Sequence, residues 1–119
     1  MESEGCILVV EDSREVREFL VMLAGEGRAM LAARSGAEAL ARLQHHRPRL
    51  ILLNYGLGDM TAADVAAAYH RLPPPHAPIV LTTGGPDAAQ LAAEIGAADW
   101  LVKPFDLDDL AALVARYAP

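Results

Sequence analysis

The chain has 119 residues, 53% of them hydrophobic and 22% charged, and its formal net charge is −6 at pH 7. This length is enough for one layered core, so we expect a single domain over residues 1–119 with its core at about 6–117. Lysine and arginine are scattered along an acidic chain. This argues against nucleic acid or an anionic membrane surface as a partner, because both require a cationic patch.

The cysteine count and the N-terminus bear on where the protein resides. Cys6 is the only cysteine, so no internal disulfide can form, and its apolar neighbours predict a buried thiol that suits a reducing compartment. Residues 1–5 are polar and acidic, unlike the basic start of a cleavable signal. No apolar run approaches the roughly 20 residues that a membrane-spanning helix requires. We therefore expect a soluble, cytoplasmic protein.

The first half of the chain alternates short apolar runs with segments of helical period. A continuous apolar run at 7–10 predicts a strand buried on both faces, and Ser13 can cap a helix that extends to about residue 25. The run at 29–33 is less apolar, which favours a strand at the edge of a sheet. Ser35 and Glu38 have the spacing of a capping box, and the helix that they begin should extend to about residue 46.

The second half continues this alternation. Asn54 follows the third predicted strand, Gly96 stands in the C-terminal stop position of the fourth helix, and Asp106 can cap the last helix. Five strands and five helices in strict alternation predict an α/β fold, with a parallel sheet and helices on both of its faces. In chain order, the elements expected in this half are a strand at 50–53, a helix at 62–72, a strand at 79–82, a helix at 87–95, a strand at 100–102 and a helix at 107–117.

Polar side chains follow four of the predicted strands. The first strand is followed by Glu11 and Asp12, the third by Asn54, the fourth by Thr83 and the fifth by Lys103. In an open parallel sheet, ligands bind at the carboxyl ends of the strands. Two carboxylates, an amide, a hydroxyl and an ammonium group should therefore converge at one edge of the sheet.

The residues around these strand ends resemble those of a known family. The segments 9–13 (Val-Val-Glu-Asp-Ser), 78–83 (Pro-Ile-Val-Leu-Thr-Thr) and 102–105 (Val-Lys-Pro-Phe) are similar to the receiver domains of response regulators and hybrid sensor kinases. Each motif alone is weak, but their order along the chain is specific, and the likeness covers about 6–117. The resemblance implies a flavodoxin-like, doubly wound (βα)5 fold with strand order 2-1-3-4-5.

The resemblance also implies a phosphoryl-transfer site. In the family, an aspartate after the third strand attacks a phosphorylated histidine or a small phosphodonor, while Mg²⁺ and a lysine neutralise charge. Carried over to this chain, Glu11, Asp12 and the carbonyl of Gly56 match the Mg²⁺ ligands. The other matches are Thr83 and Lys103 for contacts to the phosphoryl oxygens, Trp100 for the aromatic switch, and Lys103-Pro104 for a cis peptide bond.

The acceptor position departs from the family, because Asn54 occupies it. A carboxamide nitrogen is a poor nucleophile, and the amide has no charge that would help to hold Mg²⁺. We therefore expect no phosphorylation at Asn54, and Mg²⁺ that is bound weakly or not at all. The following loop also departs, since Gly58 replaces the usual proline and Thr61-Ala62 the usual Asp-Gly. The segment before the fifth strand is shorter than usual, which shortens the fourth helix.

These residues also have purely structural interpretations. Asn54 would then be a buried amide that bonds to Asp12 and Lys103, and Thr83 a hydroxyl that satisfies a loop. We favour a packing role for Trp100 over a switch role, because the phosphorylation that would move its side chain is not expected here. The four histidines have no ligand spacing and are expected at the surface.

Together these features predict a signalling module and not an enzyme. We expect a receiver domain of a two-component phosphorelay that contacts a sensor histidine kinase, a phosphotransfer protein or an output protein. A homodimer through the last helix or the fifth strand is a further candidate. One alternative is a phosphorylatable receiver with an engineered Asp-to-Asn change. Another is a flavodoxin-like flavin or nucleotide binder, which Glu11 and Asp12 disfavour because they would repel a phosphate.

Overall fold

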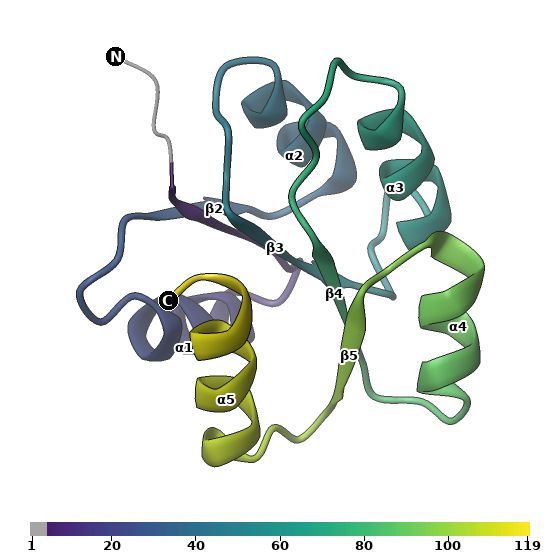
Figure 1. Cartoon of the computed structure of the whole chain (residues 1–119). Helices are drawn as coiled ribbons and strands as arrows, with labels where there is room; N and C mark the ends of the chain where they lie inside the picture. Colours follow the sequence, from purple (N-terminus) through teal and green to yellow (C-terminus); the bar gives the residue numbers. More distant parts are fainter. Residues whose placement is uncertain (1–4) are drawn as a thin grey trace.

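The computed structural model describes residues 5–119, in which five strands alternate with five helices. The elements are β1 (Ile7–Val10), α1 (Arg14–Ala24), β2 (Met30–Ala33), α2 (Gly36–Leu43), β3 (Leu50–Asn54), α3 (Ala62–His70), β4 (Ile79–Thr83), α4 (Ala88–Ile95), β5 (Asp99–Val102) and α5 (Leu107–Tyr117). The strands form one parallel sheet in the order β2-β1-β3-β4-β5. Figure 1 shows α1 and α5 on one face of this sheet and α2, α3 and α4 on the other. This is the doubly wound fold that the sequence predicts.

The sheet separates two apolar clusters. β3 is buried along its whole length, and its side chains alternate between the two faces. Leu50 and Leu52 pack with residues of α1 and α5, whereas Ile51 and Leu53 pack with residues of α2, α3 and α4. A strand covered on both faces must be apolar at nearly every position, which explains the continuous apolar runs of β1 and β3. β2 is only partly buried and lies at the edge, as expected.

Hydrogen bonds at the helix ends confirm three of the predicted caps. The Ser13 hydroxyl accepts from the backbone N–H of Val16 at 3.4 Å. At the start of α5, Asp106 Oδ1 accepts from the N–H of Asp108 at 2.8 Å. Gly96 ends α4 with φ at 75°, a left-handed conformation that glycine adopts without steric cost.

Two helices end earlier than the sequence predicts. α2 ends at Leu43 and not near residue 46, because the N–H of Gln44 donates to the carbonyl of Ala41 and tightens the last turn. α3 ends at His70 and not at residue 72, because the residue before Pro73 is biased away from helical conformation. Within residues 5–119, no helix combines the length and the apolar character that crossing a membrane requires.

The capping box at the start of α2 is only half formed. The Ser35 hydroxyl accepts from the N–H of Glu38 at 3.1 Å, as expected. The return bond differs, because Glu38 Oε1 accepts from the N–H of Arg34 at 3.2 Å and not from that of Ser35. The carboxylate still satisfies a backbone donor, one residue earlier in the chain than in a capping box.

The bounds of four strands also differ from those predicted. β3 includes Asn54 and β4 includes Thr83, so the sheet itself holds both polar residues. β2 begins at Met30 and β5 at Asp99, each displaced by one residue from its predicted start. Phe19, although apolar, is 39% exposed on α1 and is not a core residue.

Candidate functional site

Five polar residues meet at the carboxyl edge of the sheet, as the sequence predicts. Glu11 and Asp12 follow β1, Asn54 and Thr83 are the last residues of β3 and β4, and Lys103 follows β5. All five line one hollow of about 530 Å³. Parallel strands end at the same edge, and this arrangement brings together groups as far apart in sequence as 92 residues.

The carboxamide of Asn54 lies at the centre of this group and is 5% exposed. Its Nδ2 donates to Asp12 Oδ1 at 3.1 Å and to the carbonyl of Gly56 at 3.3 Å. The same nitrogen donates to Glu11 Oε2 at 3.4 Å. Its Oδ1 accepts from Lys103 Nζ at 2.9 Å. The orientation of the amide follows from chemistry, because only the NH₂ group can donate to carboxylates and only the oxygen can accept from an ammonium group.

Glu11 is the one buried charged side chain in the described part of the chain, with 1% of its surface exposed. Its Oε1 accepts from Lys103 Nζ at 2.7 Å, and its Oε2 also accepts from the backbone N–H of Ser13 at 2.9 Å. A buried carboxylate is stable only when a counter-charge and hydrogen bonds compensate for lost hydration. Lys103 therefore neutralises Glu11 and at the same time holds Asn54.

The Thr83 hydroxyl satisfies the loop that follows β4. The side chain is buried, and its Oγ1 accepts from the backbone N–H of Gly85 at 3.2 Å. This bond matches the structural role considered for Thr83. The residue also lines the hollow with Asn54 and Lys103, so its assignment as a phosphoryl contact stays a prediction.

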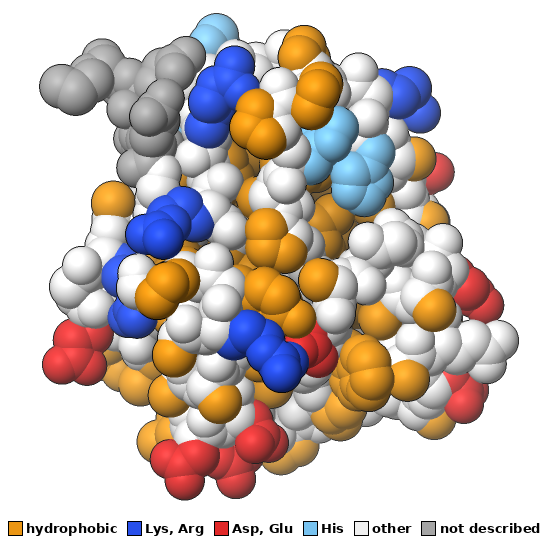
Figure 2. Space-filling model, viewed as in Figure 1, with side chains coloured by type: hydrophobic (Ala, Val, Ile, Leu, Met, Phe, Trp, Pro, Cys, Tyr) orange, Lys and Arg blue, Asp and Glu red, His pale blue; other side chains and the backbone are white. Residues whose placement is uncertain are grey.

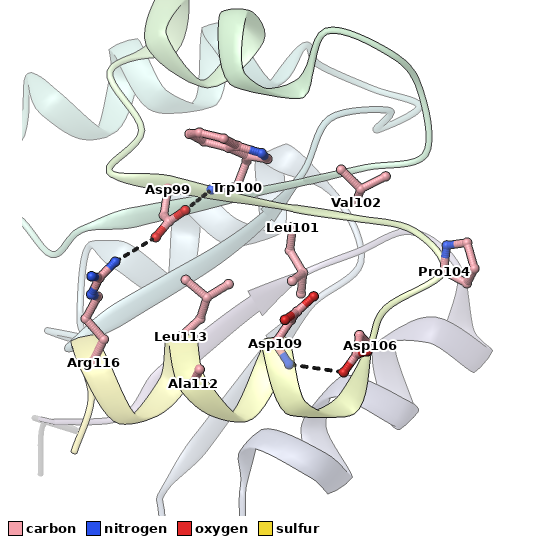
Figure 3. A pocket seen from close by; sticks show the side chains of 10 residues that line it. All are labelled: Asp99, Trp100, Leu101, Val102, Pro104, Asp106, Asp109, Ala112, Leu113 and Arg116. Atoms are coloured by element: carbon pink, nitrogen blue, oxygen red, sulfur yellow. Dashed lines mark hydrogen bonds and ion pairs between the residues drawn. The ribbon is translucent and has the colours of Figure 1, made fainter.

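Trp100 is not part of this group. Figure 3 shows it on β5, beside a different hollow that lies between β5 and α5. The side chain is 43% exposed, so the packing role favoured for it is not confirmed. The peptide bond between Lys103 and Pro104 is cis, as the resemblance implies, and so is the bond between Pro74 and Pro75.

Arg17 supports the site, and no sequence pattern singles it out. From α1, its Nη1 donates to the backbone carbonyls of Glu11 at 2.9 Å and Asp12 at 3.4 Å. These bonds attach the loop that carries the acidic pair to the helix that follows it. A surface arginine in a helix is common, so only the folded loop reveals this contact.

Asp59 supports the site from the loop after β3, and it too was missed. Its Oδ1 accepts from the N–H of Gly36 and its Oδ2 from the N–H of Ala37, both at 2.9 Å. These bonds lower the pKa of the Asp59 carboxyl below its usual value, because they favour the charged form. The partners are 22 and 23 residues away, so no local motif could have indicated the contact.

The oxygen atoms that could hold Mg²⁺ are those that the Asn54 amide contacts. Glu11, Asp12 and the carbonyl of Gly56 are the matched ligands, and Nδ2 of Asn54 donates to all three. An N–H donor and a divalent cation cannot face the same lone pairs. Within residues 5–119, no three His, Cys, Asp or Glu side chains are grouped to hold a metal ion. As arranged, the site does not fit Mg²⁺.

Comparison with known proteins identifies the family. The family model described as the response regulator receiver domain matches residues 7–115. The chain belongs to this family. This receiver domain is 37% identical over 116 residues to the response regulator protein FleR of Pseudomonas aeruginosa, which covers 94% of the chain and 24% of the relative. It is 35% identical over 111 residues to the DNA-binding response regulator MtrA of Mycobacterium tuberculosis, with 91% and 48% covered.

A solved structure places the receiver domain in the same family. The receiver domain of NtrX from Brucella abortus superposes with a TM-score of 0.84 at 27% identity, covering 94% of this chain and 97% of that one. The receiver domain spans about half or less of the length of the curated relatives that it matches. What those relatives do as whole proteins therefore does not follow from this match.

Proposed function

We propose that this receiver domain is not phosphorylated at Asn54 and acts in two-component signalling through protein–protein contact. The observation that carries this proposal is the bonding of the Asn54 amide. Its NH₂ group donates to the acidic pair and its oxygen accepts from Lys103, so both ends are already engaged. The residue at the acceptor position thus serves as a link between strand ends.

The chemistry of phosphoryl transfer supports this proposal. Transfer depends on an in-line nucleophile and on cations that neutralise the charge of the phosphoryl oxygens. A carboxamide nitrogen shares its lone pair with the carbonyl, which makes it a poor nucleophile. The only cationic side chain that lines the hollow, within the described residues, is Lys103, and Glu11 already neutralises it. The hollow therefore offers neither a good nucleophile at residue 54 nor a cationic side chain that is free of an ion pair.

The same bonds support weak or absent Mg²⁺ binding. Mg²⁺ prefers near-octahedral oxygen ligands and binds through carboxylates that supply negative charge. Here an amide replaces one carboxylate, and its N–H groups lie against the remaining oxygens. An ion could enter only after the amide turned away from Asp12 and Glu11.

We infer a cytoplasmic module whose partners are a sensor histidine kinase, a phosphotransfer protein or an output protein. Family membership supports this inference, because receiver domains of two-component systems exchange signals with such proteins. The acidic net charge of −6 supports a protein partner over direct contact with nucleic acid or a membrane. We propose that the receiver domain has no catalytic activity of its own. The flavodoxin-like flavin or nucleotide binder is the weaker reading, since two carboxylates follow β1.

Phosphorylation by a small donor tests the proposal directly. The native protein and the Asn54→Asp variant are incubated with acetyl phosphate and Mg²⁺, and the intact masses are measured. We expect no phosphoryl adduct on the native protein. An adduct that maps to residue 54 of the native protein would contradict the proposal.

In the same experiment, the Asn54→Asp variant distinguishes two explanations for the absence of phosphorylation, a change at residue 54 alone and a change of the whole site. If Asn54→Asp accepts a phosphoryl group, the rest of the machinery is intact and a single substitution removed its function. If the variant also stays unmodified, the altered loop at Gly58 and Thr61 has lost the geometry that transfer requires. Asn54→Ala serves as the matched control, because it removes the amide without adding a carboxylate.

A further inference from the structure

Two histidines form a pair at the edge of the sheet opposite the acidic site. His70 is the last residue of α3, and His76 lies in the loop that precedes β4. Their ring centroids are 5.4 Å apart. Figure 2 shows histidine side chains gathered on the surface of the molecule. The acidic site lies at the carboxyl ends of the strands, whereas this pair lies beside the amino end of β4, so the two are separate places on the protein.

A hydrogen bond of His76 fixes which of its ring nitrogens can bind a cation. Its Nε2 lies 2.7 Å from the backbone carbonyl oxygen of Leu72, which can only accept a hydrogen bond. Nε2 therefore carries the proton, and in the neutral imidazole Nδ1 keeps its lone pair. Histidines that bind metals almost always donate their second ring N–H to a carbonyl, a carboxylate or water. The bond to Leu72 thus prepares Nδ1 of His76 as a ligand.

Tyr69 holds the His76 ring in place, whereas the His70 ring is able to turn. The Tyr69 ring is buried, and its centroid lies 5.2 Å from that of His76 in an edge-to-face contact. Its hydroxyl accepts from the backbone N–H of Ala77, the residue after His76, at 2.7 Å. His70 is exposed and, within residues 5–119, ring contacts hold its side chain and no hydrogen bond does. One ring is therefore fixed, and the other can rotate to complete a binding site.

The separation of the two rings suits a transition-metal ion. Two imidazoles on a tetrahedral zinc ion have ring centroids about 5 Å apart, because each Zn–N bond is about 2.0–2.1 Å long. The observed separation of 5.4 Å is close to this value. Imidazole nitrogen suits Zn²⁺, Cu²⁺ and Ni²⁺, whereas Mg²⁺ prefers oxygen ligands. We propose that His70 and His76 together bind a divalent transition-metal ion such as Zn²⁺.

The proposed site uses two protein ligands and leaves the other coordination positions to water. This agrees with the part of the chain that the structure describes, in which no three His, Cys, Asp or Glu side chains are grouped to hold a metal ion. Ring packing alone is the competing explanation of the contact between His70 and His76. Packing predicts no binding of Zn²⁺ that depends on both histidines, so the two explanations give different results.

Calorimetric titration of the native protein with Zn²⁺ tests the site. We expect a binding event that requires both histidines, so that His70→Asn and His76→Gln each weaken it at least about tenfold. The matched control is His45→Asn, which removes another exposed histidine outside the pair and should leave the affinity unchanged. Excess Mg²⁺ should not compete, because it prefers oxygen ligands.

NMR of the imidazole nitrogens of the native protein keeps the test decisive even where a substitution disturbs the fold. Zn²⁺ should shift the signals of His76 Nδ1 and of one His70 nitrogen, while Nε2 of His76 stays protonated. Circular dichroism checks that each variant is folded. A native protein that binds no Zn²⁺, or binding that both histidine variants retain in full, would overturn the proposal. The outcome is independent of whether residue 54 accepts phosphate.

Discussion

The side chain of Asn54 differs from that of an aspartate by an NH₂ group in place of one carboxylate oxygen, and the polar residues at the strand ends are arranged around that group. The NH₂ donates toward Asp12, Glu11 and the carbonyl of Gly56, where a carboxylate would instead add a third negative group. Two unit charges about 4 Å apart repel by about 4 kcal/mol at an effective dielectric near 20. The amide removes this repulsion without a metal ion.

Replacing the amide with a carboxylate should make stability depend on Mg²⁺. In Asn54→Asp, the oxygens of Glu11 and Asp12 lose the N–H donor that Asn54 supplies and gain a like-charged neighbour. We expect the free energy of unfolding to fall by about 1–3 kcal/mol without Mg²⁺ and to recover when Mg²⁺ is added. Thermal melts with and without Mg²⁺ measure this change.

The control for this substitution is Asn54→Ala, which removes the hydrogen bonds and adds no charge. It should be destabilised to a similar extent, and Mg²⁺ should not restore it. The melting temperature of the native protein should rise less with Mg²⁺ than that of Asn54→Asp. An equal rise would contradict the explanation that Mg²⁺ relieves repulsion among three carboxylates. Fluorescence of Trp100, the only tryptophan, reports in the same samples whether the site communicates with β5.

At the scale of elements, Asp59 couples the loop after β3 to the first turn of α2. Its carboxylate satisfies two of the backbone donors that the start of a helix leaves without partners. Negative charge at that end of a helix is also favourable. The loop that Asp59 holds carries the Gly56 carbonyl, which accepts from Asn54. The contact therefore stabilises both α2 and the geometry of the site.

The contribution of Asp59 should disappear in acid. Its pKa is lower in the folded protein than the ordinary value of 3.8, so its stabilisation is fully present above 3.8 and is lost as the pH falls through the folded pKa. Asp59→Asn should lower the denaturant midpoint near neutral pH, because one acceptor and the charge are removed. The difference between native protein and variant should shrink in acid.

The matched variant for this measurement is Asp64→Asn. Asp64, like Asp59, is an exposed carboxylate near the start of a helix, but it belongs to the first turn of that helix, α3, and its side chain accepts no hydrogen bond from residues 5–119. It should show a smaller effect at neutral pH. If both variants behaved alike, general charge at the helix start would explain the result and the bonds to Gly36 and Ala37 would not.

For the molecule as a whole, the sheet divides the interior into two clusters that should respond independently. Ile7 belongs to the cluster under α1 and α5, and Ile51 to the cluster under α2, α3 and α4. Ile79 is the cross-strand partner of Ile51 on the same face. Residues on opposite faces touch different neighbours, whereas cross-strand partners share them.

Double mutants can test this division. Each Ile→Val substitution at residues 7, 51 and 79 should cost about 0.5–1.5 kcal/mol in urea unfolding. The effects at residues 7 and 51 should add within about 0.5 kcal/mol, whereas those at 51 and 79 should deviate from additivity by more. Strong coupling between residues 7 and 51 would show that the two clusters behave as one core.

Much of the fold and part of the site could be predicted because their signals are local. Short stretches of neighbouring residues predict the apolar runs of β1 and β3 and the cap at Ser13. Parallel strands then necessarily bring their carboxyl ends to one edge of the sheet. The end of α2 and the return bond of Glu38 were predicted wrongly, because a helix end depends on competition among several nearby acceptors. Asp59 was missed because its partners come from a distant segment.

The sequence by itself determined the alternation of strands and helices, the meeting of Glu11, Asn54 and Lys103 at one edge of the sheet, and the presence of an amide at the end of the third strand. These follow from periodicity and from the covalent identity of each side chain. Only the tertiary structure decided that the amide donates to the acidic pair, and that Trp100 stands exposed at a sheet edge. Those features depend on contacts through space between segments far apart in the chain, which no local pattern encodes.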